Sequence, residues 1–147
     1  MKSCIHKQKN NMFWENKAIT NKDFSKLINQ ITEDIGRSHV SPNGLHTLYL
    51  LLKKSKIFDS QDIPKNIVTI NSKIILFTES RYKQIVSIVL PGDIKNRNDV
   101  SIYSPIGLAC IGAKEKDYVN VNFKNNTQRF LIEKIVFQPE REKLLYL

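Results

Sequence analysis

The segment that most constrains the fold covers residues 100–117 and reads VSIYSPIGLACIGAKEKD. It begins with a β-branched and aromatic run, which is typical of a strand. Ser104 then stands where a helix N-cap is expected, Pro105 occupies the first helical position, and Gly112 provides a stop. The segment therefore predicts a strand, a tight junction and a short helix in immediate succession.

Two further motifs accompany this segment. Residues 68–73 read VTINSK, and residues 137–140 read FQPE at the end of a long apolar run. The order of a TINS strand, a strand, an SPIG helix followed by GAKEKD, and a strand ending in FQPE resembles the C-terminal domain of the bacterial transcript-cleavage factors GreA and GreB. Within that superfamily the chain looks like the shorter regulator of nucleoside diphosphate kinase (Rnk) family. The resemblance covers residues 63–140 well and the preceding chain in outline.

Length and composition fit a small protein with a hydrophobic core. The 147 residues are 41% hydrophobic, which is enough for one ordinary domain or a small domain with an appendage. No apolar run approaches the roughly 20 residues of a membrane span, and the first residues lack the apolar region of a secretory signal. We therefore expect a cytoplasmic protein with no membrane contact. The two cysteines, Cys4 and Cys110, give no disulfide pattern.

The formal net charge of +9 is concentrated in the front of the chain. Such an excess suits an acidic partner, either nucleic acid or a protein surface, although a lysine-rich solvated surface explains it equally well. Residues 1–19 show no periodicity, so we predict a mobile basic lead-in. Cys4 and His6 lack a second ligand pair, and we therefore expect no metal site and no cofactor.

Residues 20–58 predict a short helical hairpin, or short coiled coil. Thr20 opens a helix whose apolar positions, at helical spacing, are Phe24, Leu27, Ile28, Ile31 and Ile35. A second helix is expected from Pro42 or Asn43 to Lys54, with an apolar stripe of Leu45, Leu48, Tyr49 and Leu52. Two amphipathic helices joined by a short loop bury their stripes by pairing antiparallel. Residues 53–62 form a polar linker to the next part.

Residues 63–147 predict an antiparallel sheet domain with one short helix. Alternating apolar residues indicate strands over 67–77 and 82–90, then over 119–123 and 128–137, with the residues of the opening segment between them. Pro139 ends the last strand. The fold class is therefore α+β, and the family resemblance implies FKBP-like topology.

Catalytic templates are missing from the sequence. The histidines are not spaced with a nucleophile, and the chain has no Gly-rich phosphate loop, CxxC or HExxH motif. We expect a binding protein rather than an enzyme. The resemblance implies that its partner is RNA polymerase, contacted at the β′ rim of the secondary channel. We expect the protein to be a monomer. By the same resemblance, the docking residues are those around the SPxG motif: Tyr103, Ser104, Pro105, Ile106 and Gly107. Each also has a structural interpretation, as a cap, a helix start or a core residue.

The resemblance also raises the question of transcript cleavage. Gre factors carry an acidic pair at the tip of a long coiled coil, where the carboxylates help to hold a catalytic Mg²⁺. In this chain the hairpin tip offers Glu33 and Asp34, followed by Arg37. A helix of about 14 residues spans only roughly 20 Å. We therefore expect a Rnk-like regulator that docks without cleaving. A Gre-type cleavage factor with a shortened arm, and a nucleic-acid-binding protein using the basic hairpin, remain the alternatives.

Overall fold

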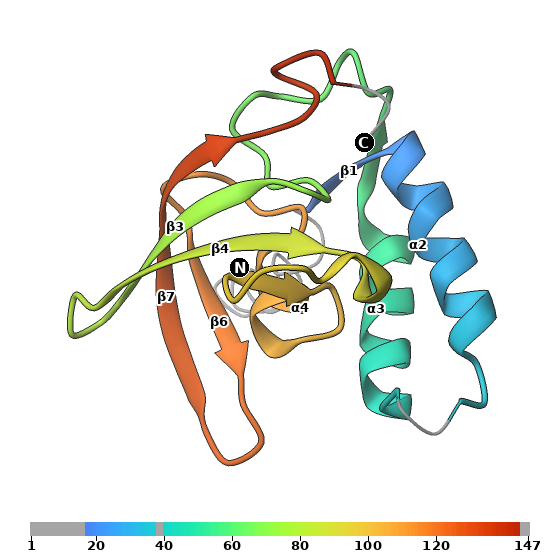
Figure 1. Ribbon diagram of the computed structural model, residues 1–147, viewed down its shortest axis with the longest axis horizontal. Helices are drawn as coiled ribbons and strands as arrows, with labels where there is room; N and C mark the ends of the chain where they lie inside the picture. The colour runs from blue at the N-terminus through green and yellow to red at the C-terminus, as the bar shows by residue number, and fades with distance from the viewer. Residues whose placement is uncertain (1–16, 38–39, 145–147) are drawn as a thin grey trace, which may run out of the picture.

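The computed structural model describes residues 17–37 and 40–144. A helical hairpin lies beside a curled five-stranded sheet that carries one short helix (Figure 1). In chain order the elements are β1 (Ala18–Thr20), α2 (Asn21–Asp34), α3 (Pro42–Lys54), β2 (Lys56–Phe58), β3 (Lys73–Thr78), β4 (Lys83–Val89), the 3-10 helix η1 (Pro91–Asp93), β5 (Asp99–Ser101), α4 (Pro105–Cys110), β6 (Tyr118–Asn122) and β7 (Thr127–Phe137). The predicted α+β class, with a hairpin followed by a sheet domain, is confirmed.

Helices α2 and α3 run antiparallel, and each begins at a side-chain cap (Figure 1). The Thr20 hydroxyl accepts a hydrogen bond from the Asp23 N–H, and the Ser41 hydroxyl accepts one from the Gly44 N–H. These bonds satisfy N–H groups that have no partner inside the helix. Leu27 and Leu48 are both fully buried, and burying such a side chain stabilises the fold by about 1.5–3 kcal/mol.

Three positions on the hairpin differ from the predicted apolar stripes. Ile35 is 67% exposed because the helix ends at Asp34 and the backbone of Ile35 leaves the helical conformation. Tyr49 is 46% exposed, whereas Leu51 is buried. The buried face of α3 is therefore rotated toward Leu51 relative to the stripe that the sequence predicts.

A small parallel sheet joins the two ends of the hairpin. Strand β1 pairs with β2, with Ile19 opposite Ile57. The residues of β1 are buried, and the Ala18 N–H donates to the Gly112 carbonyl at 3.0 Å. Residues 17–19 thus belong to the folded part, not to the predicted lead-in, because they are buried and hydrogen-bonded to β2 and to Gly112. The rest of that lead-in lies outside the described residues.

The large sheet has the strand order β5-β4-β3-β7-β6. All of its pairs are antiparallel except β4 with β5, which is parallel, so the sheet is mixed and not purely antiparallel as predicted. The reason is the connection through η1 and residues 94–98, which returns the chain to the same end of the sheet before β5 begins. Register shifts along β7 mark bulges, which increase local twist and help the sheet curl.

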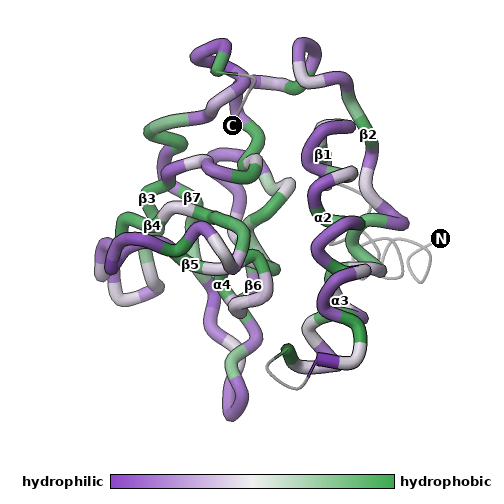
Figure 2. Tube along the Cα trace, turned by 45° about the vertical axis from the view of Figure 1, so that its right-hand side comes forward, coloured by the Kyte–Doolittle hydropathy of each residue, from purple (hydrophilic) through white to green (hydrophobic). Residues whose placement is uncertain are grey.

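One hydrophobic core is shared by the hairpin and the sheet domain. Leu27 and Leu51 from the helices belong to the same buried cluster as Ile74, Ile102 and Ile132 from the sheet domain. The hydropathy-coloured trace shows apolar segments where the two parts face each other (Figure 2). The sheet domain therefore covers the apolar side of the hairpin, and the hairpin does not stand free.

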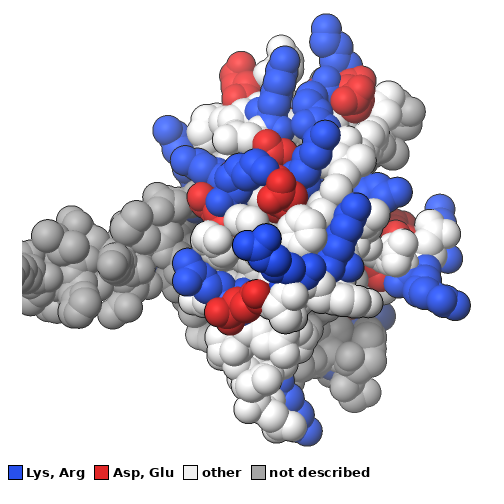
Figure 3. Space-filling view, turned by 90° about the vertical axis from the view of Figure 1, so that its left-hand side faces the viewer, with Lys and Arg blue, Asp and Glu red and all other residues white. Residues whose placement is uncertain are grey.

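The other face of the sheet is open and basic. Lys and Arg side chains gather over this side of the molecule, with fewer acidic groups between them (Figure 3).

In the part of the chain that the structure describes, no helix combines the length and the apolar character needed to cross a membrane.

Candidate docking site

The start of α4 is built by a tight hydrogen-bonded turn. Ser104 is the N-cap: its hydroxyl accepts from the Gly107 N–H at 3.0 Å and donates to the Ser101 carbonyl at 2.6 Å. Pro105 follows in the first turn, where its missing N–H costs nothing and its fixed φ suits the helix. The predicted strand, junction and helix are confirmed, and Ser104 has a structural role.

Gly107 is required by close packing. It is buried, and a Cβ atom at this position would lie 2.1 Å from the Ser101 carbonyl oxygen. No side chain fits there without moving the backbone. Gly107 therefore brings α4 against the end of β5 and is not exposed to a partner.

Pro105 and Ile106 form the accessible apolar part of the motif. Pro105 is exposed, while Ile106 is half-buried and packs against the core. A cleft of ≈ 610 Å³ lies on one side, and its apolar lining includes Ile106, Phe123 and Phe130. A second cleft of ≈ 550 Å³ lies between α4 and the start of α3, and its lining includes Pro105. The helix start is thus an apolar ridge between two clefts.

Tyr103 connects the motif to the hairpin. Its hydroxyl donates to the Asp34 carboxylate at 3.0 Å. Burial, followed by the hydrogen bond to Asp34 and its negative charge, raises the pKa of Tyr103 well above its usual range. Asp34 is only 4% exposed and also accepts from the Gln30 amide at 2.7 Å. The hydrogen bond between Tyr103 and Asp34 therefore connects the C-terminal end of α2 to the sheet domain.

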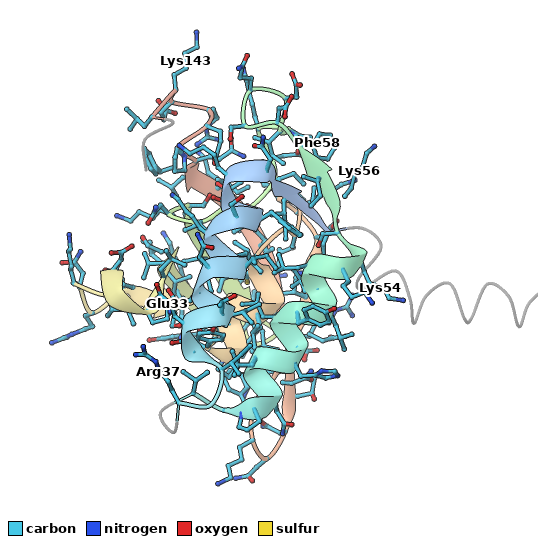
Figure 4. All side chains as sticks on the ribbon, turned by 90° about the vertical axis from the view of Figure 1, so that its right-hand side faces the viewer. Glu33, Arg37, Lys54, Lys56, Phe58 and Lys143 are labelled. Carbon is cyan, nitrogen blue, oxygen red and sulfur yellow. The ribbon has the colours of Figure 1, made fainter. Side chains whose placement is uncertain are left out.

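The predicted tip residues do not form one exposed acidic group. Glu33 and Arg37 are exposed near the same end of α2 (Figure 4). Asp34, in contrast, is buried. The prediction of Asp34 as a residue of the hairpin tip is wrong, because its carboxylate is buried and accepts a hydrogen bond from Tyr103, 69 residues further along the chain.

A second buried carboxylate, Asp23, joins the other end of α2 to the sheet domain. Its Oδ2 accepts from the Ile70 N–H at 2.9 Å. Burial is the largest cause that raises the pKa of Asp23 to about 7; the Ile70 hydrogen bond acts against it, and the nearby Glu140 adds to it. The contact could not be predicted from the sequence, because Ile70 lies 47 residues after Asp23.

Two more buried groups lie where β1 meets α4. The Lys17 ammonium donates to the Ala109 carbonyl, and burial lowers the pKa of Lys17 to about 8. Burial raises the pKa of the neighbouring Cys110 thiol to about 12, so this thiol is not a reactive nucleophile at neutral pH. Residues 17–37 and 40–144 contain no cluster of three potential metal ligands. Cys4 and His6 lie outside those ranges.

The fold and the motif define an α+β protein in which a proline-started helix lies across a curled sheet beside a helical hairpin. The family described as "Transcription elongation factor, GreA/GreB, C-term" matches residues 63–137, just over half of the chain. The chain belongs to this family.

A solved structure at 22% identity shows the same fold. The prokaryotic transcription elongation factor GreA/GreB from Nitrosomonas europaea has 22% sequence identity, with 83% of this chain and 98% of that chain covered, at a TM-score of 0.67. The GreA factor homolog 1 (Gfh1) of Thermus thermophilus has 15% identity, with 83% and 99% covered, at a TM-score of 0.45. Among curated proteins, none matches the sequence.

Proposed function

We propose that the protein binds RNA polymerase at the β′ rim of the secondary channel and modulates transcription without promoting transcript cleavage, as a monomeric Rnk-like member of its family. Membership of the GreA/GreB family supports polymerase as the partner. The features that separate binding from cleavage lie in the hairpin.

The observation that carries the proposal is the hydrogen bond between Asp34 and Tyr103. Two-metal hydrolysis needs carboxylate oxygens that reach the metal and aim at it. Here one of the two candidate carboxylates is buried against the sheet domain, and α2 has 14 residues, a length of about 21 Å. Glu33 alone remains exposed in this pair, on a hairpin that packs along its own sheet domain. Such a hairpin is a poor means of delivering an acidic pair to a distant active centre.

The proposed docking surface is the ridge at the start of α4. Ser104, Gly107 and Tyr103 hold its shape through the contacts described above, and Pro105 and Ile106 supply the apolar atoms that a partner would cover. Clefts on both sides would let a helical partner surround the ridge and exclude water. This division assigns binding to two of the five motif residues and rigidity to the other three.

A matched pair of substitutions tests the docking surface. Pro105→Asp adds a carboxylate to the ridge and should preserve α4, since acidic residues are favoured in the first turn of a helix. Pro42→Asp makes the same change at the start of α3, where an exposed proline also follows a capping serine. With RNA polymerase from the source organism immobilised, we expect Pro105→Asp to abolish binding and Pro42→Asp to retain it. Both should keep the melting temperature.

Retained binding by a folded Pro105→Asp protein would overturn the docking surface. Absence of binding by the unmodified protein would overturn the proposed partner. Acceleration of transcript cleavage by the unmodified protein would favour the short-armed cleavage factor instead.

A further inference from the structure

The outer face of the sheet carries a row of side chains that the docking ridge does not use. Register aligns Lys83 on β4, Phe77 on β3, Leu131 on β7 and Tyr118 on β6. Their neighbours along each strand, such as Leu76 and Ile132, are buried, so the row itself faces outward. The row thus crosses the sheet with Lys83 at one end, the apolar Phe77 and Leu131 in the middle, and the exposed Tyr118 at the other end.

Aromatic rings and cations alternate on this face. The Arg129 guanidinium lies over the Tyr118 ring, 4.1 Å from its centroid, and Tyr118 is 58% exposed. Phe77 is half-buried two strands away, a separation of about 9.5 Å. A hollow of ≈ 510 Å³ lies between them, and its lining includes Phe77, Tyr118, Arg81 and Arg129. The face therefore offers flat stacking surfaces with guanidinium groups at their edges.

Charge on this face favours a polyanion. The exposed basic residues on these strands and their ends include Lys73, Arg81, Lys83, Lys116, Arg129 and Lys134, and the acidic residues there are the exposed Glu79 and Asp117 and the half-buried Glu133. Glu133 is already paired with Lys116 at 2.7 Å. The view of this side shows the same predominance of basic groups (Figure 3).

Proteins that bind single-stranded nucleic acid combine such a basic surface with aromatic rings on which bases stack.

We infer that the outer sheet face, centred on Phe77, Tyr118 and Arg129, binds single-stranded RNA. Bases stack on the two rings, and the surrounding cations contact phosphates. Outward amides on the adjoining strand β6, Asn120 and Asn122, supply donors and acceptors for base edges and 2′-hydroxyl groups. Arg129, Asn120 and Asn122 also line the clefts beside the docking ridge, whereas Phe77 and Tyr118 lie outside both linings. The inference does not depend on polymerase binding.

The test is fluorescence anisotropy of a labelled oligouridylate of about 12 nucleotides with the full-length protein. Tyr118→Ala should raise the Kd about fivefold or more, whereas Tyr118→Phe, which keeps the ring, should leave it within about twofold. Arg129→Gln should weaken binding and reduce the salt slope of log K by about 0.7, the contribution of one phosphate contact on a single strand. Melting temperatures confirm that each variant is folded.

A matched control exists on the hairpin. Tyr49 is also an exposed tyrosine with a cation over its ring, the Lys53 ammonium at 5.7 Å from the centroid. Tyr49→Ala and Lys53→Gln should leave the Kd unchanged. Equal weakening by these variants, or an unmodified protein that does not bind the RNA, would overturn the inference.

Two further ligands test whether the surface prefers RNA over DNA and over an acidic polypeptide. Oligothymidylate of the same length should bind more weakly than the RNA, and polyglutamate should bind weakly and without dependence on Tyr118. Tighter binding of the DNA would contradict the assignment to RNA. Polyglutamate binding that is lost in Tyr118→Ala would instead identify a surface for an acidic protein.

Discussion

Replacing Asp23 by Asn tests whether a buried carboxylate joins α2 to the sheet domain. Asp23 is 3% exposed, its Oδ2 accepts from the Ile70 N–H, and its backbone N–H donates to Thr20. Asn retains an acceptor oxygen for Ile70 but cannot ionise. The substitution therefore removes the charge and keeps the hydrogen bond.

The expected change in the free energy of unfolding follows from the pKa of Asp23, which burial raises from 3.8 to about 7. Between pH 3.8 and about pH 7, the Asp23 carboxyl group is protonated in the folded protein and ionised in the unfolded chain. The stabilisation is complete below about pH 4 and is lost as the pH rises to about 7. A shift of about 3 pKa units corresponds to a loss of about 4 kcal/mol in the free energy of unfolding. Asp23→Asn does not undergo this loss, so it should match the unmodified protein near pH 4 and exceed it near pH 8.

Urea unfolding at a series of pH values measures this difference. The exposed Asp62 provides a control, since Asp62→Asn should follow the unmodified protein at every pH. The series should stop at about pH 8, because Lys17, with a pKa lowered from 10.5 to about 8, adds stability as the pH rises through that range. A difference in unfolding free energy between Asp23→Asn and the unmodified protein that stays constant with pH would contradict the raised pKa of Asp23.

Three further predictions concern the motif and the domain boundary. Gly107→Ala should lower the free energy of unfolding by several kcal/mol, because its Cβ would lie 2.1 Å from the Ser101 carbonyl; an unchanged thermal melt would contradict this. Tyr103→Phe should cost about 1–3 kcal/mol in urea unfolding, since it removes a donor from the buried Asp34 carboxylate, and a change below about 0.5 kcal/mol would show that this bond is unimportant. Residues 63–147 should still unfold cooperatively without the hairpin, but at a lower temperature, because truncation exposes core residues that the hairpin covers. A thermal melt without a transition would show that the sheet domain needs the hairpin.

Local patterns in the sequence were sufficient to predict the three α-helices and the longer strands. The caps at Thr20, Ser41 and Ser104 and the prolines that follow two of them define the starts of α2, α3 and α4. Alternation of apolar residues gave β6 and the long strand β7. These features depend on residues only a few positions apart, so they can be predicted from the sequence without knowledge of the tertiary structure.

Contacts between distant segments could not be predicted in the same way. The pairing of β1 with β2 involves strands of three residues each, too short to show a period. Asp34 looks like an ordinary helix-end acid until Tyr103, 69 residues later, donates to it. The parallel register of β5 depends on the path of the loop before it. The residues at the start of α4 were recognised in the sequence, but only packing separates the buried Gly107 from the exposed Pro105.

Proposed binding to polymerase without cleavage is tested most directly by RNA shortening in backtracked elongation complexes. Added alone at saturation, the protein should not increase shortening above the polymerase's own rate. Added with a long-armed cleavage factor, it should slow that factor's reaction, and Pro105→Asp should not. Faster shortening with the unmodified protein alone, lost in Glu33→Ala, would contradict the account and assign a cleavage role to the hairpin.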